Sequence, residues 1–288
     1  MLPSDVTVTH HFVDLPSLRM HYVEAGEGPV VLLLHGFPEC WWSWRYQLKA
    51  LPAAGFRVIA PDLRGYGETD KQGPYDLDTV TADVCHLIET LGGEKRVRVV
   101  GHDWGGAVAW HLASKRPEHC AKVAVLNCPH PQKMREALLV RPKLRQLRKS
   151  WYMFFFQLPL LAEYLLTRDD AAEVVKQLRG SAVDRTNFSE AELRPLRDAI
   201  QRPGAAAAMV GWYRAGITLK PPPVYPPITS EALLIWGKSD VALDYDVLVP
   251  GTERFAPRLR VEPIEHCGHF VQAEQPQKVN QLLLDFLR

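Results

Sequence analysis

Short apolar runs that alternate with helical patterns limit what this chain can fold into more than any other feature. The runs are four to eight residues long, which is typical of β-strands. Several stretches between them repeat apolar residues on one helical face, as residues 77–91 do. Repeated strand-then-helix order predicts an α/β fold with a mostly parallel, eight-stranded sheet covered on both faces. The predicted strands are Val6–Val13, Leu18–Glu24, Val30–Leu34, Arg57–Pro61, Val97–Gly101, Val123–Leu126, Ala232–Trp236 and Leu259–Ile264.

Two places depart from this simple alternation. A short Pro16-Ser17 turn joins the first two strands, so we predict an antiparallel hairpin at the sheet edge and hence a mixed sheet. After the sixth strand, residues 129–227 carry helical, aromatic and basic segments without a strand pattern. We therefore predict that residues 129–227 form an inserted helical cap domain. Residues 1–128 and 228–288 are then the two parts of one core domain.

Two segments of the predicted cap receive structural interpretations. The proline-rich stretch Lys220–Pro227 is expected to be a rigid, extended linker into the seventh strand, because prolines remove backbone donors and favour extended chain. The most apolar stretch, Trp151–Leu166, is shorter than a bilayer requires and is interrupted by polar residues and a proline. We expect a buried helix there rather than a membrane span.

Charge and cysteine content disfavour several classes of partner. The chain has 34 basic and 33 acidic residues, and the net charge of +1 provides no field to hold a nucleic acid or an acidic membrane surface. The basic run between Arg135 and Lys149 is accordingly interpreted as a solvated helix face. Five scattered cysteines without a C-x-x-C pair argue against disulfides and structural zinc. Together with an N-terminal sequence that does not resemble a secretion signal, they predict a cytoplasmic protein.

A tight turn between the fifth strand and a helical pattern is the strongest functional signal. The sequence Gly101-His-Asp-Trp-Gly-Gly106 follows the strand at once and leads into the helical pattern Ala107–Leu112. Glycines two residues before and after Asp103 allow a sharp bend that exposes the central side chain at the carboxyl edge of the sheet. An aspartate can also cap a helix, but a cap does not require the flanking glycines. We therefore predict that Asp103 is a catalytic nucleophile.

An aspartate at this turn indicates the kind of bond that is attacked. Attack by a serine on a saturated carbon would leave an ether, which the protein could not cleave. Attack by a carboxylate leaves an ester, which water can hydrolyse at the carbonyl carbon. The residue type therefore favours displacement at an sp³ carbon that bears a leaving group, followed by hydrolysis of the ester. This chemistry requires neither a metal nor a cofactor, and we expect neither.

A base for the second step and its acid partner are predicted after the last two strands. His269 lies in a loop after the last strand, directly behind Cys-Gly, and is favoured over the nearby His266. Asp240 follows the seventh strand, where a carboxylate would fix the imidazole tautomer and stabilise the imidazolium. Asp244 and Asp246 are alternatives to Asp240, which is preferred because it lies closest to the strand end.

Hydrolysis of an ester passes through an oxyanion, which requires fixed donors worth about 3–4 kcal/mol of the barrier each. The residue after the nucleophile, Trp104, is predicted to supply one backbone N–H group. Phe37 in His35-Gly-Phe-Pro38, directly after the third strand, is predicted to supply the other. The alternative interpretation of this tetrapeptide is a plain Gly-Pro turn, but its position after the third strand favours the oxyanion hole.

Taken together, these motifs resemble the α/β-hydrolase-fold epoxide hydrolases over essentially the whole chain. The similarity is specific at Gly101–Gly106 and Cys267-Gly-His269, and it extends to His35–Glu39, Trp44–Gln47 and Asp62–Gly67. The resemblance implies the α/β-hydrolase fold, in which the nucleophile precedes the acid and the acid precedes the histidine. It also implies a monomeric or homodimeric epoxide hydrolase. Such an enzyme converts a small-molecule epoxide and water into a vicinal diol through a covalent ester on the nucleophile.

The resemblance also assigns a role to two tyrosines of the predicted cap. In that family two such tyrosines hydrogen-bond the epoxide oxygen, and this chain has similar segments at Tyr152 and Tyr213. Ring opening generates an alkoxide, so a phenol can donate a hydrogen bond or a proton as charge develops. Without the family, Tyr152 would be interpreted as packing in an aromatic helix. The substrate-binding residues implied by the resemblance are Phe37, Trp104, Tyr152 and Tyr213.

Other functions stay open on the sequence alone. Haloalkane dehalogenases share the aspartate turn, but they use a second Trp or an Asn in the first loop, where this chain has Phe37. Fluoroacetate dehalogenases have an Arg next to the nucleophile, where this chain has Trp104. Serine esterases are disfavoured by Asp103 itself. A non-catalytic member of the fold that only binds a small apolar ligand is disfavoured by the complete catalytic set.

Overall fold

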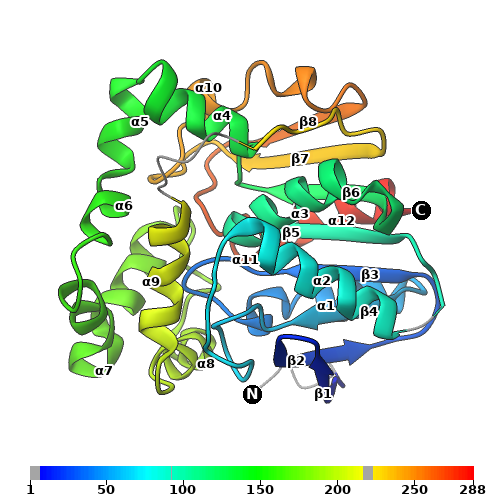
Figure 1. The fold of residues 1–288 in the computed structure, drawn as a ribbon, viewed down its shortest axis with the longest axis horizontal. Helices are drawn as coiled ribbons and strands as arrows, with labels where there is room; N and C mark the ends of the chain where they lie inside the picture. Colours follow the sequence, from blue (N-terminus) through cyan, green and yellow to red (C-terminus); the bar gives the residue numbers. More distant parts are fainter. Residues whose placement is uncertain (1–6, 92, 217–222) are drawn as a thin grey trace.

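An eight-stranded sheet forms the centre of the molecule in the computed structural model, which describes residues 7–91, 93–216 and 223–288 (Figure 1). The strand order is β1-β2-β4-β3-β5-β6-β7-β8. The β1–β2 and β2–β4 pairs are antiparallel and the other pairs are parallel, which confirms the predicted mixed sheet. The strands are β1 Thr9–Leu15, β2 Leu18–Ala25, β3 Val30–Leu34, β4 Arg57–Pro61, β5 Val97–His102, β6 Cys120–Leu126, β7 Glu231–Gly237 and β8 Leu259–Ile264.

The boundaries of β1 and β6 differ from the predicted ones. Strand β1 extends to Leu15, which pairs with Leu18 across the expected turn. Its pairing with β2 starts at Thr9, whereas Val6, where the strand was predicted to begin, lies outside the described residues. Strand β6 begins three residues earlier than predicted because Cys120 pairs with β5.

Helices cover both faces of the sheet because buried strands present apolar side chains alternately to each side. In β3, Leu32 belongs to the hydrophobic cluster under α2 and α3, and its neighbour Leu33 belongs to the cluster under α1 and α12. Burial of each such side chain contributes about 1.5–3 kcal/mol. The helices of these layers are α1 Gln47–Ala53, α2 Leu77–Leu91, α3 Asp103–Lys115 and α12 Pro276–Leu287; the short ones are η1 Trp41–Trp44, η2 Pro117–His119, α10 Tyr245–Leu248, η4 Thr252–Arg254 and α11 Val271–Glu274.

Between β6 and β7 the described residues form helices and loops only. Figure 1 shows helices α5 to α9 together at one end of the molecule, beside the ends of the strands. The indole of Trp212 in α9 donates a hydrogen bond to the carbonyl of Arg64, which follows β4, so these helices lie over the carboxyl edge of the sheet. The helices are α4 Pro131–Arg135, the π-helix η3 Glu136–Val140, α5 Leu144–Lys149, α6 Trp151–Phe155, α7 Leu161–Gly180, α8 Glu190–Ile200 and α9 Ala205–Gly216.

The expected single buried helix at 151–166 is wrong. Helix α6 ends at Phe155 and α7 begins at Leu161. Leu160 between them has a positive φ of 67°, and Pro159 offers no N–H group, so the helix cannot continue. Trp151 is 64% exposed and Leu160 is 81% exposed, so much of this apolar stretch lies at the surface.

The predicted proline-rich linker is only partly described. Residues 223–227 have no regular secondary structure, and residues 220–222 lie outside the described part of the chain. The rigid, extended form of the linker stays a prediction. Within the three described stretches, no helix is both long enough and apolar enough to cross a membrane.

Candidate active site

The turn after β5 places Asp103 as predicted, at the first position of α3. Its φ of 49° is in the left-handed region, which a non-glycine residue adopts only where the surroundings impose it. The backbone passes so closely that a Cβ on Gly105 would lie 2.2 Å from the carbonyl oxygen of Leu34. A Cβ on Gly101 would lie 2.2 Å from the carbonyl oxygen of Gly105. The two glycines therefore permit the bend that brings the Asp103 side chain to the sheet edge.

The Asp103 carboxylate lies between a backbone donor and an imidazole. The Phe37 N–H group donates to Asp103 Oδ1 at 2.9 Å, and His269 Nε2 lies 3.5 Å from Oδ2. The side chain is only 14% exposed. Burial alone would raise the pKa of Asp103, but the hydrogen bond and charge of His269 and the Phe37 N–H group outweigh it, so the pKa is lowered. Asp103 is therefore an anion with one oxygen already held by a backbone donor.

His269 lies between the predicted nucleophile, Asp103, and its predicted acid partner, Asp240. Its Nδ1 atom lies 2.7 Å from Asp240 Oδ2, while Nε2 faces Asp103. Burial favours the neutral ring, but the charge of Asp240 and the hydrogen bonds to both carboxylates prevail, so the pKa of His269 is raised well above its ordinary value. The sequence alternative His266 is exposed. The structure thus brings Asp103, His269 and Asp240 together.

Asp240 is held by donors on both of its oxygens. The N–H groups of Ala242 and Leu243 donate to Oδ1 at 2.7 and 2.9 Å, and the amide of Asn127 donates to Oδ2 at 2.7 Å. Burial would raise the pKa of Asp240, but the charge of His269 and these hydrogen bonds lower it. Asp240 is therefore ionised and fixed in place, as a partner of imidazolium must be.

The two alternatives to Asp240 have other surroundings. Asp244 accepts a hydrogen bond from the N–H group of Val247 at the start of α10 and forms an ion pair with Arg145. Asp246 is 67% exposed. Neither contacts the imidazole of His269 in the described structure.

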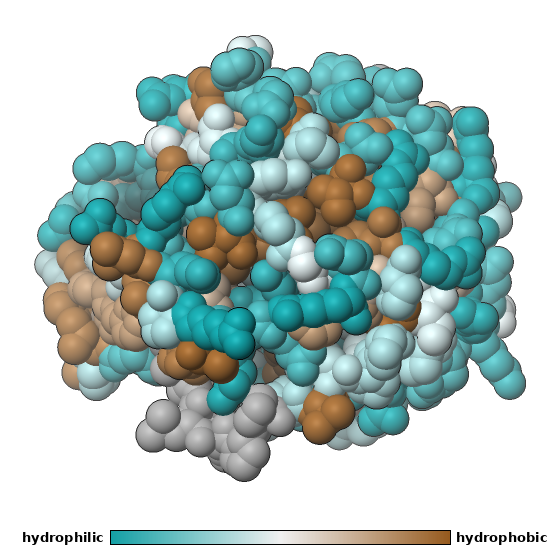
Figure 2. Space-filling view, turned by 90° about the horizontal axis from the view of Figure 1, so that it is seen from above, coloured by the Kyte–Doolittle hydropathy of each residue, from teal (hydrophilic) through white to brown (hydrophobic). Residues whose placement is uncertain are grey.

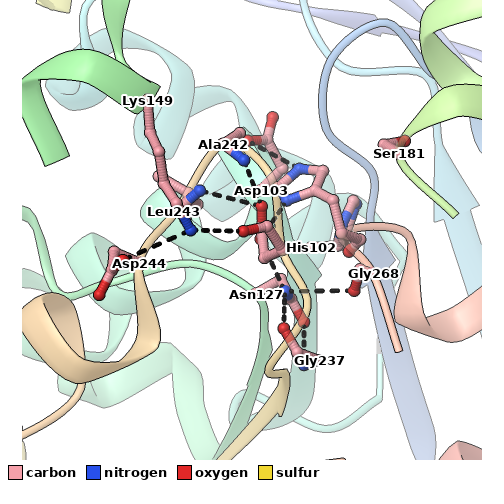
Figure 3. Close-up of polar contacts among 12 residues, drawn as sticks. His102, Asp103, Asn127, Lys149, Ser181, Gly237, Ala242, Leu243, Asp244 and Gly268 are labelled. Carbon is pink, nitrogen blue, oxygen red and sulfur yellow. Dashed lines mark hydrogen bonds and ion pairs between the residues drawn. The ribbon is translucent and has the colours of Figure 1, made fainter. Parts of the chain in front are cut away.

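Asn127, which the sequence interpretation missed, connects three loops behind the imidazole. It is fully buried, directly after β6, and has a φ of 40°. Besides its bond to Asp240, its amide nitrogen lies 3.3 Å from the carbonyl oxygen of Gly237 and 3.5 Å from that of Gly268, and its oxygen accepts from the Gly237 N–H group at 2.8 Å (Figure 3). In the sequence it resembles any asparagine after a strand, so only its contacts reveal it.

A second buried network, also missed, connects the loop of Phe37 to the turn of Asp103. Glu39 Oε2 accepts from the Gly36 N–H group at 2.8 Å and lies 2.8 Å from His102 Nδ1. Its other oxygen accepts from Gln272 at 2.9 Å. His102 Nε2 in turn lies 2.9 Å from the carbonyl oxygen of His269. This network fixes the backbone donor, the nucleophile and the base relative to one another.

The two predicted cap tyrosines face the same cavity as Asp103. Tyr213 comes from α9 and Tyr152 from α6, and their ring centroids are 5.8 Å apart. The ring of Tyr213 also lies 5.2 Å from those of Phe37 and Trp104. Burial, followed by the charge of Asp103, raises the pKa of both phenols well above the ordinary value. Both side chains therefore remain protonated and can act as donors.

All four residues predicted to bind substrate lie at the site, but the contacts that support a role differ between Phe37 and Trp104. Phe37 supplies the backbone donor described above, and its ring packs on Tyr213. Trp104 is half-buried and lines the cavity, with its ring against Tyr213 and Trp212. The oxyanion role of the Trp104 N–H group stays a prediction.

A mainly apolar cavity of about 580 Å³ is lined by Asp103 and by residues of α4, α6 and α9. This volume suits a small organic molecule. Farther from Asp103 the wall contains a polar pair, in which His111 Nε2 lies 2.9 Å from Asp78 Oδ1. In the described stretches, no group of three or more His, Cys, Asp or Glu side chains is arranged to hold a metal ion.

Comparisons with known proteins agree with this geometry. Residues 29–276 match the family model described as alpha/beta hydrolase fold. The chain is 39% identical to the AB hydrolase superfamily protein YfhM of Bacillus subtilis, over 96% of this chain and 97% of that protein. It is 36% identical to epoxide hydrolase 4 of Homo sapiens, over 97% of this chain and 79% of that protein.

A solved structure of an epoxide hydrolase from Bacillus megaterium in complex with an inhibitor superposes with a TM-score of 0.87 at 28% identity. The superposition covers 96% of this chain and 99% of the bacterial one. Fold, site geometry and similarity agree, and the chain belongs to the α/β-hydrolase fold family and, within it, to the epoxide hydrolases.

Proposed function

We propose that this protein hydrolyses epoxides to vicinal diols through a covalent ester on Asp103. One observation carries the proposal: a nucleophilic carboxylate, a histidine base and two protonated phenols border a single apolar cavity. An epoxide requires this combination, because it has no leaving group other than its own ring oxygen. The names of the relatives support the same substrate class.

The first step opens the ring. The Asp103 carboxylate attacks one epoxide carbon, a C–O ester bond forms, and the C–O bond of the ring breaks. The released oxygen develops negative charge and takes a proton from Tyr152 or Tyr213. The raised pKa values of these phenols keep the proton available until that charge appears.

The second step hydrolyses the ester. His269 takes a proton from water, and the resulting hydroxide attacks the carbonyl carbon of the Asp103 ester. The oxyanion is stabilised by the Phe37 N–H group, and its 2.9 Å hydrogen bond to Asp103 Oδ1 supports this role. Collapse of this intermediate releases the diol and returns the carboxylate with one oxygen from water. Imidazolium then returns its proton to the tyrosinate through solvent or product.

Ester formation itself prepares the base. The Asp103 charge is one of the causes of the raised pKa of His269. Alkylation neutralises that charge, so the pKa of His269 falls within the intermediate. A proton that the ring carries in the resting protein then passes to solvent, the neutral ring acts as the base, and solvent supplies the proton again once the Asp103 carboxylate is restored.

The decisive experiment is to trap the ester. In the His269→Gln variant, ring opening proceeds but hydrolysis stops, so mass spectrometry should show the protein heavier by one substrate, with the adduct on Asp103. The Asp103→Asn variant should show neither adduct nor turnover. A single turnover of the unaltered enzyme in heavy-oxygen water should label Asp103. Diol formation without that label would overturn the covalent mechanism.

The tyrosines can be tested separately from the base. Tyr213→Phe should slow the opening step by roughly 10²–10⁴-fold, the range for a lost general acid. Pre-steady-state kinetics should show that hydrolysis of the ester is much less affected. A parallel assay for halide release from a haloalkane separates this activity from that of a dehalogenase, for which Phe37 offers no side-chain donor to the halide.

A further inference from the structure

Exposed hydrophobic side chains are concentrated on one part of the cap. Nine of the thirteen large hydrophobic residues exposed in the described structure lie between residues 139 and 164. Single exposed apolar residues are ordinary, but a cluster of exposed apolar residues is typical of a surface that binds a protein, a membrane or a ligand. These nine residues, which we call the cap patch, are Leu139, Val140, Leu144, Trp151, Phe154, Leu158, Leu160, Leu161 and Tyr164.

The same part of the chain is strongly basic. Residues 133–149 contain seven basic residues and one acidic residue, Glu136, although the whole chain is nearly neutral. Arg145 and Lys149 lie close to Asp244, which partly offsets their charge. The basic residues Arg141, Lys143 and Arg148 are exposed and have no ion-pair partner in the described structure. The surface around residues 133–149 is therefore positively charged, although the net charge of the whole chain is only +1.

The elements that carry these residues share one end of the molecule. Figure 1 shows α5, α6 and α7 along the left side of the molecule. Figure 2, in which the same end lies to the left, shows hydrophobic surface there beside hydrophilic residues. The cap patch also adjoins the cavity, because Leu139 and Phe154 belong to both.

We propose that the cap patch, together with a basic rim formed by Arg141, Lys143 and Arg148, binds the surface of an anionic lipid bilayer. Leu, Phe and Trp side chains beside Lys and Arg are the composition of protein surfaces that lie in the lipid headgroup region. The apolar side chains enter the interface, while the free cations contact anionic headgroups. A second copy of this chain fits less well, because a two-fold interface would bring the same basic rim against itself.

Charge and apolar contact can be tested on vesicles. The unaltered protein should float with vesicles of phosphatidylcholine and phosphatidylserine, bind those of phosphatidylcholine alone much more weakly, and dissociate as salt is raised. The triple variant Arg141→Glu, Lys143→Glu, Arg148→Glu should bind the mixed vesicles at least roughly tenfold more weakly, as expected for basic groups near such a surface. The double variant Leu144→Ser, Leu160→Ser should lose a similar fraction of binding.

Matched controls place the same changes elsewhere on the surface. Phe12→Ser with Val224→Ser replaces two exposed apolar residues outside the cap patch. Arg194→Glu with Arg258→Glu reverses two exposed charges outside the basic rim. Both pairs should leave vesicle binding unchanged. None of the substituted residues lines the cavity, so turnover of a water-soluble epoxide should persist in all variants, and circular dichroism should show an intact fold.

Three outcomes would overturn the proposal. They are equal binding to both kinds of vesicle, equal weakening by the control variants, and a stable dimer in sedimentation velocity that the cap-patch variants dissociate. The last outcome would assign the surface to a second copy. Because binding is measured without substrate, failure here is separate from failure of the proposed reaction.

Discussion

The imidazole of His269 lies between two carboxylates, and this position determines how it titrates. Asp240 lies 2.7 Å from one ring nitrogen and Asp103 lies 3.5 Å from the other. Each negative charge favours imidazolium over the neutral ring. Of these two charges only that on Asp103 disappears during the proposed reaction, so of the two carboxylates Asp103 alone changes the basicity of the ring from step to step.

Asp103→Asn should therefore lower the pKa of His269 relative to the unaltered protein. The substitution removes a charge that stabilises imidazolium and keeps the size of the side chain. Titration of the ring nitrogens by NMR would measure the shift without any substrate. Asp246→Asn, which removes an exposed carboxylate, should leave that pKa unchanged. An identical His269 pKa in the Asp103 variant would show that the nucleophile does not control the base.

Asn127 supports Asp240 from behind, so Asn127→Ala should affect both stability and rate. The change leaves the Gly237 N–H group without its acceptor and removes one donor from Asp240. We expect a loss of about 1–3 kcal/mol in the free energy of unfolding, measured with urea. Single-turnover kinetics should show slower ester hydrolysis with a shifted pH profile. Asn280→Ala, remote from the imidazole, should destabilise without changing that profile.

At the scale of elements, the strand–turn–helix unit around Asp103 depends on close backbone contact. Gly105→Ala would bring a methyl group against the carbonyl of Leu34 in β3, which belongs to the centre of the sheet and cannot move away. We expect a loss of about 3 kcal/mol or more, visible as a lower thermal midpoint. Gly180→Ala, at a helical glycine with open space, should be within about 0.5 kcal/mol of neutral. Equal effects would contradict the steric argument.

The strands could be predicted from the sequence because local periodicity determines their burial. The bounds and burial of α6 and α7 could not be predicted, because they depend on packing between helices. The run at β3 is apolar on both faces and has one stable environment, the centre of a sheet. The run at 151–166 is also mainly apolar, but its environment depends on how α5 to α7 pack, which no local pattern indicates. Tyr152 and Tyr213 were found through family resemblance rather than periodicity.

In the candidate site, too, some residues could be predicted from the sequence and others could not. Asp103 and His269 could be found because glycines and strand ends mark their positions in the chain. Asn127, Glu39 and His102 act through contacts between residues far apart in sequence, such as the bond from Asn127 to Asp240. Such pairings follow from strand order, which a single sequence does not specify.

At the scale of the whole molecule, core and cap residues belong to one hydrophobic cluster. Val108 of α3, Leu178 of α7 and Ile200 of α8 are members of it. The indole of Trp42 also donates to the carbonyl of Glu192 across this boundary. A cap that shares its interior with the core has little stability of its own.

The cap helices α7 to α9 should therefore unfold together with the sheet in one transition. Hydrogen exchange measured by mass spectrometry at rising denaturant would follow both regions in the same sample. Peptides from α7 to α9 and from β3 and β5 should gain exchange at the same denaturant concentration. Earlier exchange across all three cap helices would show instead that the predicted cap is an independent domain.

A single connection, between β6 and β7, carries all the helices of the predicted cap that the structure describes. Neighbouring parallel strands always require a long crossover, and here that crossover carries the cap. The chain leaves β6 at Asn127, whose N–H group bonds to Ile235 of the very strand to which the chain returns. Related proteins can therefore differ in the segment between β6 and β7 while they keep the same sheet and the same loops around Asp103. Asp103, Asp240 and His269 stay with the sheet and its loops, whereas the cavity wall and the two tyrosines that assist ring opening change with the crossover.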